Sequence, residues 1–483
     1  MRYVRLLRIL ILILGLVALT MVPCLVMALV LGESAMIRAF VFPMGITLGA
    51  ALPAAALYPR RKQFRLRSRD GFLLVFLAWV FAAFLGAIPY YFAEAGIRFT
   101  DAVFESTCGF ATTGASTIAD VEALPQSLIL WRSLSHWFGG MGIVLLTVAL
   151  MPILGVGGFQ LIKAESPGPE KEKITPKVTA TAKLLWLAYG VLTALLAGLF
   201  RLGGMRWFDA ACHAFTIMAS GGVSTKNSGL AFYNSVFIDG TAAVFMLLAG
   251  LNFSLFYQLL RGKFSGILRN SEGRAYFIIF LAAASVITLS LLPVYGSAGT
   301  ALRYAVYQTA SILSTTGSAI ADYETWPDIA RMVLFGLMFV GGCSGSTAGG
   351  IKVIRHLVLW KQAGNELRRI IYPQGIFSVR LNRKVGRKDV VYGVAGFIFL
   401  YMLVVAITTL AVAAASGTDL FSSFSAAVSV TGNVGTGFGA VGPAHTYRDF
   451  PDHIKWLFSF VMIAGRLELW TVFILFTPEY WRR

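Results

Sequence analysis

The sequence is poor in charged residues and in the side chains that build metal and disulfide sites. Only 13% of its 483 residues are Asp, Glu, Lys or Arg, against about 25% in a typical soluble protein. Its four cysteines and five histidines are scattered, without the spacing of a disulfide framework or a zinc site. No catalytic triad, paired carboxylates or metal cluster emerges either. These shortages argue against an enzyme and predict no organic cofactor in this chain.

Apolar residues are abundant instead, at 57% of the chain. A bilayer span needs about 20 consecutive apolar residues, with about 17 as the lower limit. Nine of ten apolar runs are long enough, and the eighth is interrupted by glycines. The first run lacks a clear cleavage site and is interpreted as a retained helix. The sequence therefore predicts an all-α polytopic membrane protein with runs at 6–30, 39–57, 72–92, 128–154, 184–200, 235–260, 275–294, 332–340, 390–415 and 454–476.

The net charge of +18 is concentrated in a few short segments between these runs. If ten spans are threaded, all of these segments lie on one side of the membrane. This is the positive-inside pattern, and it places both termini in the cytoplasm. The charge thus indicates topology and predicts no nucleic-acid partner. The segments lie at 2–8, 60–69, 163–183, 261–274, 352–388 and 482–483.

One short pattern, small and hydroxyl residues around a glycine, occurs four times. The central glycines are Gly114, Gly222, Gly317 and Gly435, which are 108, 95 and 118 residues apart. Such a stretch suits a strained, extended backbone whose carbonyls point one way. Four of them around one axis would form a ring of carbonyl oxygens that replaces the water around a potassium ion. The alternative is close helix packing in a membrane, but four occurrences with the same flanks favour the ring.

The flanks of these glycine loops define four repeats of long helix, short helix, loop and long helix around a central pore. Two additional N-terminal helices precede them. The short helices are expected at 101–111, 209–219, 304–314 and 422–432, with Asp101, Asp209 and Ser422 as N-caps. Each spans about half a bilayer and directs its negative C-terminal end at the membrane centre. The predicted divisions are 1–70 (added helices), 71–160, 161–262, 263–370 and 371–483 (repeats 1 to 4).

A glycine-rich stretch at 341–350 falls where a transmembrane helix should be in mid-span. Five glycines with Ser and Thr predict a flexible intramembrane loop beneath the ring, which would act as a gate. A helix kink or a tight packing face is the alternative. Arg466, inside the last apolar run, must be paired or hydrated, and we expect it to face the pore or the carbonyls of this loop.

Two further features remain open from the sequence. Glu105, in the first short helix, has a snorkelling or helix-dipole interpretation and a functional one. The polar segment 164–176 and the basic segment 364–390 are either solvent-facing loops or a docking surface for a soluble subunit.

Four stretches together resemble the Trk-type potassium uptake subunits of the TrkH/KtrB/HKT superfamily. They are 105–116 (ESTCGFATTGAS), 164–169 (AESPGP), 341–352 (GGCSGSTAGGIK) and 465–468 (GRLE). The resemblance covers essentially the whole chain. It implies a homodimer in membrane lipid, a pore in each protomer, and a cytoplasmic nucleotide-binding regulatory ring of the TrkA type.

The resemblance also implies the residues of the potassium filter and of the gate. By position, the filter takes Thr112, Thr113, Gly114, Ser220, Gly221, Gly222, Thr315, Thr316, Gly317, Asn433, Val434 and Gly435. The gate takes Gly341, Gly342, Ser344, Gly345, Ser346, Thr347, Gly349, Gly350 and Arg466.

The function expected from the sequence is potassium uptake, with potassium as the transported ion. In the fourth filter a threonine stands between Gly435 and Gly437, where the family often has proline, and the second filter lacks the double threonine. These departures leave a sodium-permeable transporter of the same fold as an alternative, although glycine at all four central positions favours potassium. A polytopic membrane enzyme is a second, weaker alternative.

Overall fold

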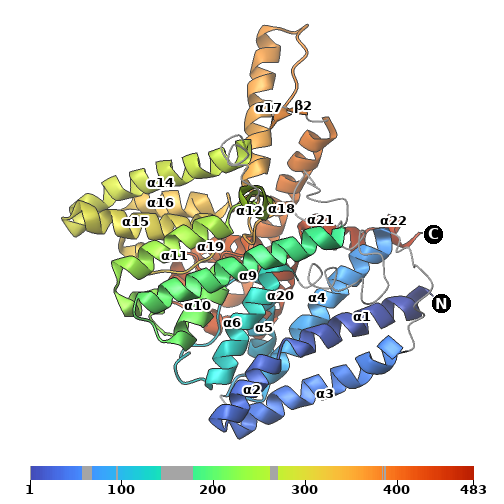
Figure 1. The fold of residues 1–483 in the computed structure, drawn as a ribbon. Coiled ribbons are helices and arrows are strands. Elements are labelled where there is room, and N and C mark those ends of the chain that lie inside the picture. Colours follow the sequence, from blue (N-terminus) through green and yellow to red (C-terminus); the bar gives the residue numbers. More distant parts are fainter. Residues whose placement is uncertain are drawn as a thin grey trace.

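The computed structural model describes residues 2–56, 68–93, 96–142, 178–260, 270–382, 384–385 and 388–482. It is almost entirely helical, and the segments that are far apart in sequence gather around one centre (Figure 1). The predicted segment 164–176 and most of the basic loops at 60–69 and 163–183 lie outside the described residues.

Three N-terminal helices form the outer edge of the molecule. They are α1 (Arg2–Leu19), α2 (Val22–Leu31) and α3 (Ser34–Ala56). Pro23 lies in the first turn of α2, where a missing N–H costs nothing. Gly32 ends α2 in a left-handed conformation at φ +70°. These helices pack against the first repeat, and the two chain ends lie at the same side of the molecule (Figure 1).

The rest of the chain follows one order four times: a long helix, a short helix, a loop and a second helix. The first unit has α4 (Ser68–Tyr91), α5 (Phe99–Ala111) and α6 (Gln126–Met141). The second has α9 (Val178–Leu202), α10 (Trp207–Met218), η1 (Gly229–Tyr233), α11 (Val236–Ala249) and α12 (Phe253–Leu260). The third has α14 (Ser271–Tyr295), α15 (Ala298–Leu313), η2 (Tyr323–Thr325), α16 (Asp328–Met338) and α17 (Val353–Ile371).

The fourth unit follows a small hairpin that extends with α17 away from the body of the molecule (Figure 1). The hairpin pairs β1 (Arg380–Leu381) antiparallel with β2 (Lys384–Val385). The unit itself comprises α18 (Lys388–Ser416), α19 (Leu420–Gly432), η3 (Gly439–Val441), η4 (Tyr447–Asp449), α20 (Asp452–Arg466), α21 (Leu469–Phe473), η5 (Ile474–Phe476) and α22 (Pro478–Trp481).

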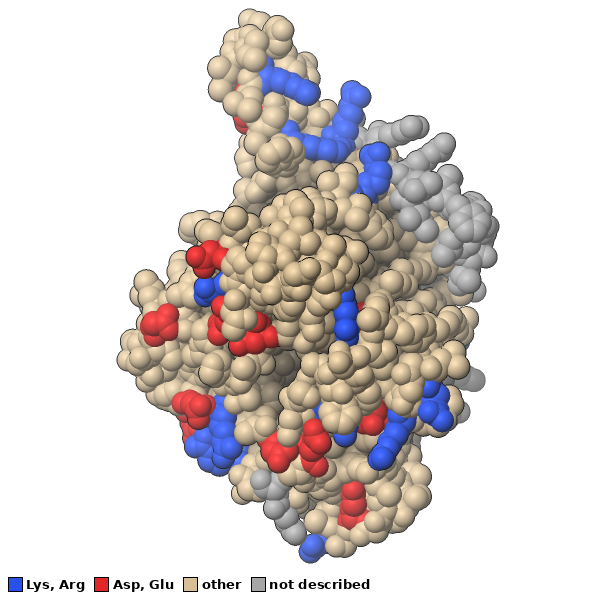
Figure 2. Space-filling model, turned by 90° about the vertical axis from the view of Figure 1, so that its left-hand side faces the viewer, with Lys and Arg blue, Asp and Glu red and all other residues tan. Residues whose placement is uncertain are grey.

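Within the described residues, six helices are long and apolar enough to cross a membrane, or seven if the bent pair after α20 counts as one span. Most of the surface in Figure 2 is uncharged, as a lipid-facing surface requires. The chain is thus a multi-pass membrane protein, but two of the nine predicted spans are interrupted within the described residues. The run 235–260 breaks between α11 and α12, and the run 454–476 bends by 112° after Arg466, whereas the run 6–30 has only a short turn between α1 and α2 and still counts as one span. In the run 128–154, α6 ends at Met141, and residues 143–154 lie outside the described residues.

Glycines explain why these second helices end where they do. A β-carbon on Gly139 would overlap the carbonyl oxygen of Phe110, and one on Gly465 would overlap that of Thr431. Both of these carbonyl groups lie at the C-terminal end of the short helix in the same unit. Glycine therefore lets each second helix approach the end of its short helix at backbone distance. The apolar runs continue in the sequence beyond Met141 and Arg466, where α6 and α20 end.

The predicted N-caps of the short helices are wrong. The residues before the first turns are Arg98 in α5, Arg206 in α10 and Asp419 in α19, and only Asp419 caps with its side chain, through a 3.0 Å bond from the Ser422 N–H. Asp101 and Asp209 lie in the first turn, where their carboxylates accept from Lys455 and Thr225, each at 2.6 Å. These two carboxylates thus bind tertiary partners and do not cap their helices. The third short helix, α15, begins at Ala298, ahead of Tyr304.

Candidate ion-conduction site

The four glycine loops meet in one closed ring. A β-carbon on Gly114 would lie 2.5 Å from the Gly221 carbonyl oxygen of the second unit. In the same way, Gly222 abuts the Thr316 oxygen, Gly317 the Val434 oxygen and Gly435 the Thr113 oxygen. Each unit thus contacts the next, and the fourth contacts the first. The residue before each central glycine presents its carbonyl oxygen to the neighbouring loop, so four such oxygens surround one axis.

The backbone conformation of the ring is the same in all four loops. The residues two positions before the glycines are left-handed, with φ of 53° at Thr112, 57° at Ser220, 56° at Thr315 and 52° at Asn433. The glycines themselves have φ of 80°, 62°, 71° and 91°. A left-handed threonine, serine or asparagine is strained and persists only where its surroundings hold it. The same strained conformation therefore turns the backbone in the same way in all four loops.

Small polar side chains of the short helices hold the loops from behind. Thr216 donates to the Val223 oxygen at 2.9 Å, and Ser311 donates to the Ser318 oxygen at 2.6 Å. In the fourth unit Tyr447 contacts Ser429 at 3.2 Å and donates to the Gly435 oxygen at 2.9 Å. Thr216, Ser311 and Ser429 each stand six residues before the central glycine, as does Cys108. This constant spacing is visible in the four sequence segments, but it was not among the predicted site features.

Glu105 has neither a snorkelling role nor a simple dipole role. Its side chain is buried and accepts from the Ser116 hydroxyl at 2.8 Å and from the Thr117 N–H at 2.5 Å. It also pairs with the buried Arg132, at 3.3 Å between Nε and Oε2. Glu105 therefore fixes the outer end of the first loop, and Arg132 compensates its charge, as a buried carboxylate requires.

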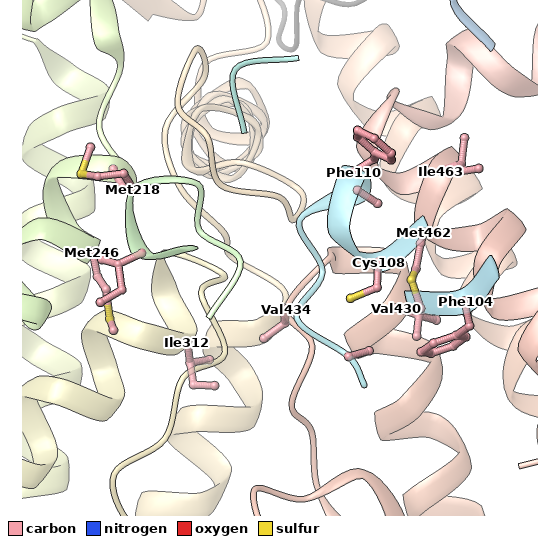
Figure 3. Packing of buried hydrophobic residues seen from close by; sticks show 14 of the residues in the cluster. Phe104, Cys108, Phe110, Met218, Met246, Ile312, Val430, Val434, Met462 and Ile463 are labelled. Atoms are coloured by element: carbon pink, nitrogen blue, oxygen red, sulfur yellow. The ribbon is translucent and has the colours of Figure 1, made fainter. Parts of the chain in front are cut away.

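Apolar side chains pack around the ring on both sides (Figure 3). Met218 and Met246 come from the second unit, whereas Cys108, Val430 and Met462 lie across the converging loops. Val434 lies among the loops themselves. This packing places apolar side chains behind the loops, beside the hydroxyl groups that donate to the loop carbonyls.

The glycine-rich segment 341–350 lies directly against the ring. No helix covers it, because α16 ends at Met338 and α17 begins at Val353. The Thr347 hydroxyl is 2.9 Å from the Ser220 hydroxyl, and the Gly349 N–H donates to the Thr315 hydroxyl at 2.6 Å. The Gly350 N–H donates to the Gly432 oxygen at 2.8 Å. The segment thus touches the filter ends of the second, third and fourth units.

The other half of this segment is held by the break in the second unit. The Cys343 N–H donates to the Gly250 oxygen at 2.8 Å, and the Phe253 N–H donates to the Gly345 oxygen at 3.0 Å. These bonds use backbone groups that the break between α11 and α12 leaves free. Glu272 accepts from the Ser344 N–H at 2.6 Å and from the Ile354 N–H at 3.2 Å. Backbone polar groups at membrane depth are thus satisfied by protein.

Arg466 connects the segment to the first unit. Its guanidinium donates to the Thr347 oxygen at 2.6 Å, to the Gly139 oxygen at 2.8 Å and to the Gly140 oxygen at 2.7 Å. The segment and Arg466 together contact all four units. The structure therefore places Arg466 on the carbonyls of the glycine break, one of the two positions that the sequence left open.

Arg466 is not the only cation beside this segment. Lys352 donates to the Ala348 oxygen, and Arg355 donates to the Ile351 oxygen at 2.8 Å. Arg355 also pairs with Glu468 at 2.8 Å. Glu468 lies two residues after Arg466 and is left-handed at φ 61°, beyond the end of α20. In the described part of the chain no group of His, Cys, Asp and Glu is arranged to hold a metal ion.

Comparison with known proteins identifies the family. A family model named TrkH, described as "Cation transport protein", matches residues 39–483. The Trk system potassium uptake protein TrkH of Salmonella typhimurium is 40% identical over 428 residues, which cover 88% of each chain. That of Halomonas elongata is 38% identical over 484 residues, covering 99% of each. The crystal structure of the potassium transporter TrkH from Vibrio parahaemolyticus aligns with a TM-score of 0.88 at 34% identity, covering 100% of both chains.

These relatives confirm the resemblance predicted from the sequence, and they are transport proteins, which rules out the membrane-enzyme alternative. The chain therefore belongs to the TrkH family of cation transport proteins.

Proposed function

We propose that this protein takes up potassium across the bacterial inner membrane through the ring of filter carbonyls. The closed contact of each central glycine with the next unit's carbonyl oxygen carries this proposal. Relatives named as potassium uptake proteins support the choice of ion.

The chemistry of the ring suits a monovalent cation. Carbonyl oxygens of Thr113, Gly221, Thr316 and Val434, with those of the residues before them, replace the hydration shell of the ion without adding a full charge. The C-terminal ends of α5, α10, α15 and α19 all lead into the ring, so their dipoles favour a cation there. The ring is therefore electrostatically attractive yet weak enough to release the ion.

The experiment that tests this function is growth of a potassium-uptake-deficient bacterium on low potassium, followed by rubidium and sodium flux in reconstituted vesicles. Potassium uptake predicts growth and a rubidium flux well above the sodium flux. Comparable fluxes of both ions would favour the sodium-permeable alternative, for which the unusual Thr436 and the missing double threonine in the second loop are the structural reasons.

We further propose that residues 341–350 and Arg466 form the gate and that the protein is a homodimer regulated by a cytoplasmic nucleotide-binding ring. The termini and the basic segments then lie in the cytoplasm, and the repeats divide at the boundaries 70, 160, 262 and 370. Support for the gate comes from its contacts with all four units, and α17 with its hairpin extends on from it, far from the ring (Figure 1).

The docking surface gives a separate prediction. Arg368 and Arg369 are exposed near the end of α17, and 171–173 is a second charged segment, outside the described residues. Deleting 171–173 together with Arg368→Gln and Arg369→Gln should weaken co-purification of the ring about tenfold, because exposed charges guide such contacts. Arg331→Gln, at a half-buried arginine near the start of α16, is the control. If the complex is fully retained, the ring docks elsewhere.

A further inference from the structure

The second filter loop differs from the other three at the position before its central glycine. Thr113, Thr316 and Val434 carry side chains there, whereas the second loop has Gly221. The φ of Gly221 lies outside the left-handed region, so its backbone conformation alone admits any residue. The reason for glycine must therefore be the space around it.

That space is occupied by the imidazole of His136 in α6. A β-carbon on Gly221 would overlap His136 Cδ2 and would lie 2.9 Å from Cγ and 3.2 Å from Cβ. All three nearest atoms belong to this one side chain. The imidazole also faces the short helix of the first unit, where a β-carbon on Gly109 would lie 3.7 Å from His136 Nδ1. The imidazole is thus wedged between the first short helix and the second filter loop.

The hydrogen bonding of His136 fixes the ring in one orientation. Its Nδ1 is 2.8 Å from the Arg132 oxygen, one turn earlier in α6. A carbonyl oxygen only accepts, so Nδ1 carries a proton. Nε2 is buried and has no hydrogen-bond partner among the described residues. Nε2 is bonded to Cδ2, the atom nearest to Gly221, so Nε2 lies beside the second filter loop without a hydrogen-bond partner. An apolar side chain would have filled the same space without leaving a polar group unpaired.

We propose that His136 is a specificity-determining positioning residue, which replaces the side chain missing at Gly221 and holds the Gly221 carbonyl in the ring. This inference rests on the proposed filter function. The Gly221 oxygen is the one that faces Gly114, so it is the second unit's contribution at this level of the ring. Because the imidazole is anchored to α6, the position of this helix sets the position of one of the four coordinating oxygens.

Two single substitutions should disturb this contact in opposite ways. His136→Ala leaves a void behind the second loop and frees its carbonyl. Gly221→Ala inserts a methyl group into the imidazole. Each should lower the rubidium-to-sodium flux ratio about tenfold, whereas the double variant His136→Ala with Gly221→Ala should recover to within about threefold of wild type, because the new methyl group enters the space that the ring leaves.

The test is a double-mutant cycle of flux ratios in reconstituted vesicles, with size-exclusion profiles to show that each variant is folded. Gly190→Ala, where a β-carbon meets nothing within 4 Å, is the matched control. His136→Gln, which keeps a side-chain N–H for the Arg132 oxygen, should retain more selectivity than His136→Leu. That pair keeps the test informative if His136→Ala does not fold.

The results separate this inference from the function beneath it. Wild-type ratios in both single variants, or a double variant whose losses simply add, would overturn the role of His136. Wild-type selectivity in both the Gln and the Leu variant would overturn it as well, because neither side chain reproduces the contact of the imidazole with Gly221. Gly114→Ser is included as a filter variant: if it too leaves the ratio unchanged, the filter proposal itself fails.

Discussion

Serine in place of any of the four central glycines is expected to abolish uptake or to lower the rubidium-to-sodium flux ratio by at least about tenfold. At Gly114 the new β-carbon would lie 2.5 Å from the Gly221 oxygen, and at the other three glycines it would overlap the facing oxygen more deeply. Overpacking of this kind costs about 1–3 kcal/mol, equivalent to about tenfold to a hundredfold in an equilibrium. The left-handed φ of each glycine adds strain. Gly114→Ser should therefore be the mildest of the four.

The measurement is rubidium and sodium flux in vesicles that contain the purified variant. Gly417→Ser is a suitable control, because Gly417 is left-handed at φ 65° but has nothing within 4 Å of its would-be β-carbon. It reproduces the backbone strain without the carbonyl contact. Unchanged rubidium flux and sodium exclusion in all four filter variants would contradict the ring, and an equal loss in Gly417→Ser would attribute the effect to strain alone.

The equivalence of the four glycine loops was predictable because their signal is local and repeated. Four short segments with a glycine at the same place, each after a short apolar helix, specify four equivalent backbones wherever they meet. The break at 341–350 was predictable for a similar reason, since several glycines with Ser and Thr do not sustain a helix. Arg466 was recognisable because a cation in an apolar run demands a partner.

Contacts between distant residues were not predictable. Asp101 and Asp209 have the composition and position of N-caps, but their carboxylates bind Lys455 and Thr225 instead. The ends of α11 and α20 depend on what approaches Gly250 and Gly465, which the apolar run does not reveal. The pairing of His136 with Gly221 joins residues 85 positions apart by shape alone. Periodicity and composition carry no information on such pairs.

The gate gives the second large expected effect. Removal of 344–349 should raise basal flux in the absence of the regulatory ring by more than tenfold, because it deletes Thr347 and Gly349, which contact the filter ends. Arg466→Ala should raise it less, since Lys352 and Arg355 still hold the second half of the segment. Hydrogen bonds from a charged group contribute about 1.5–3 kcal/mol each. Losing the one bond that reaches the segment, at the Thr347 oxygen, shifts a closed-to-open equilibrium by about tenfold or more.

Arg466→Lys is the informative intermediate. Lysine keeps the positive charge but replaces the planar fork with a single ammonium group, so it cannot satisfy the Thr347, Gly139 and Gly140 oxygens with the same geometry. Basal flux should therefore rise in the order wild type, Arg466→Lys, Arg466→Ala, deletion, and nucleotide control should fall in the same order. Arg331→Ala, whose arginine pairs with Asp328 away from the segment, should behave as wild type. A segment that blocks the pore cannot be shortened or released from its anchor without opening the pore. If the deletion variant and Arg466→Ala both fold, insert into the membrane and keep wild-type basal flux, residues 341–350 are therefore only a packing kink.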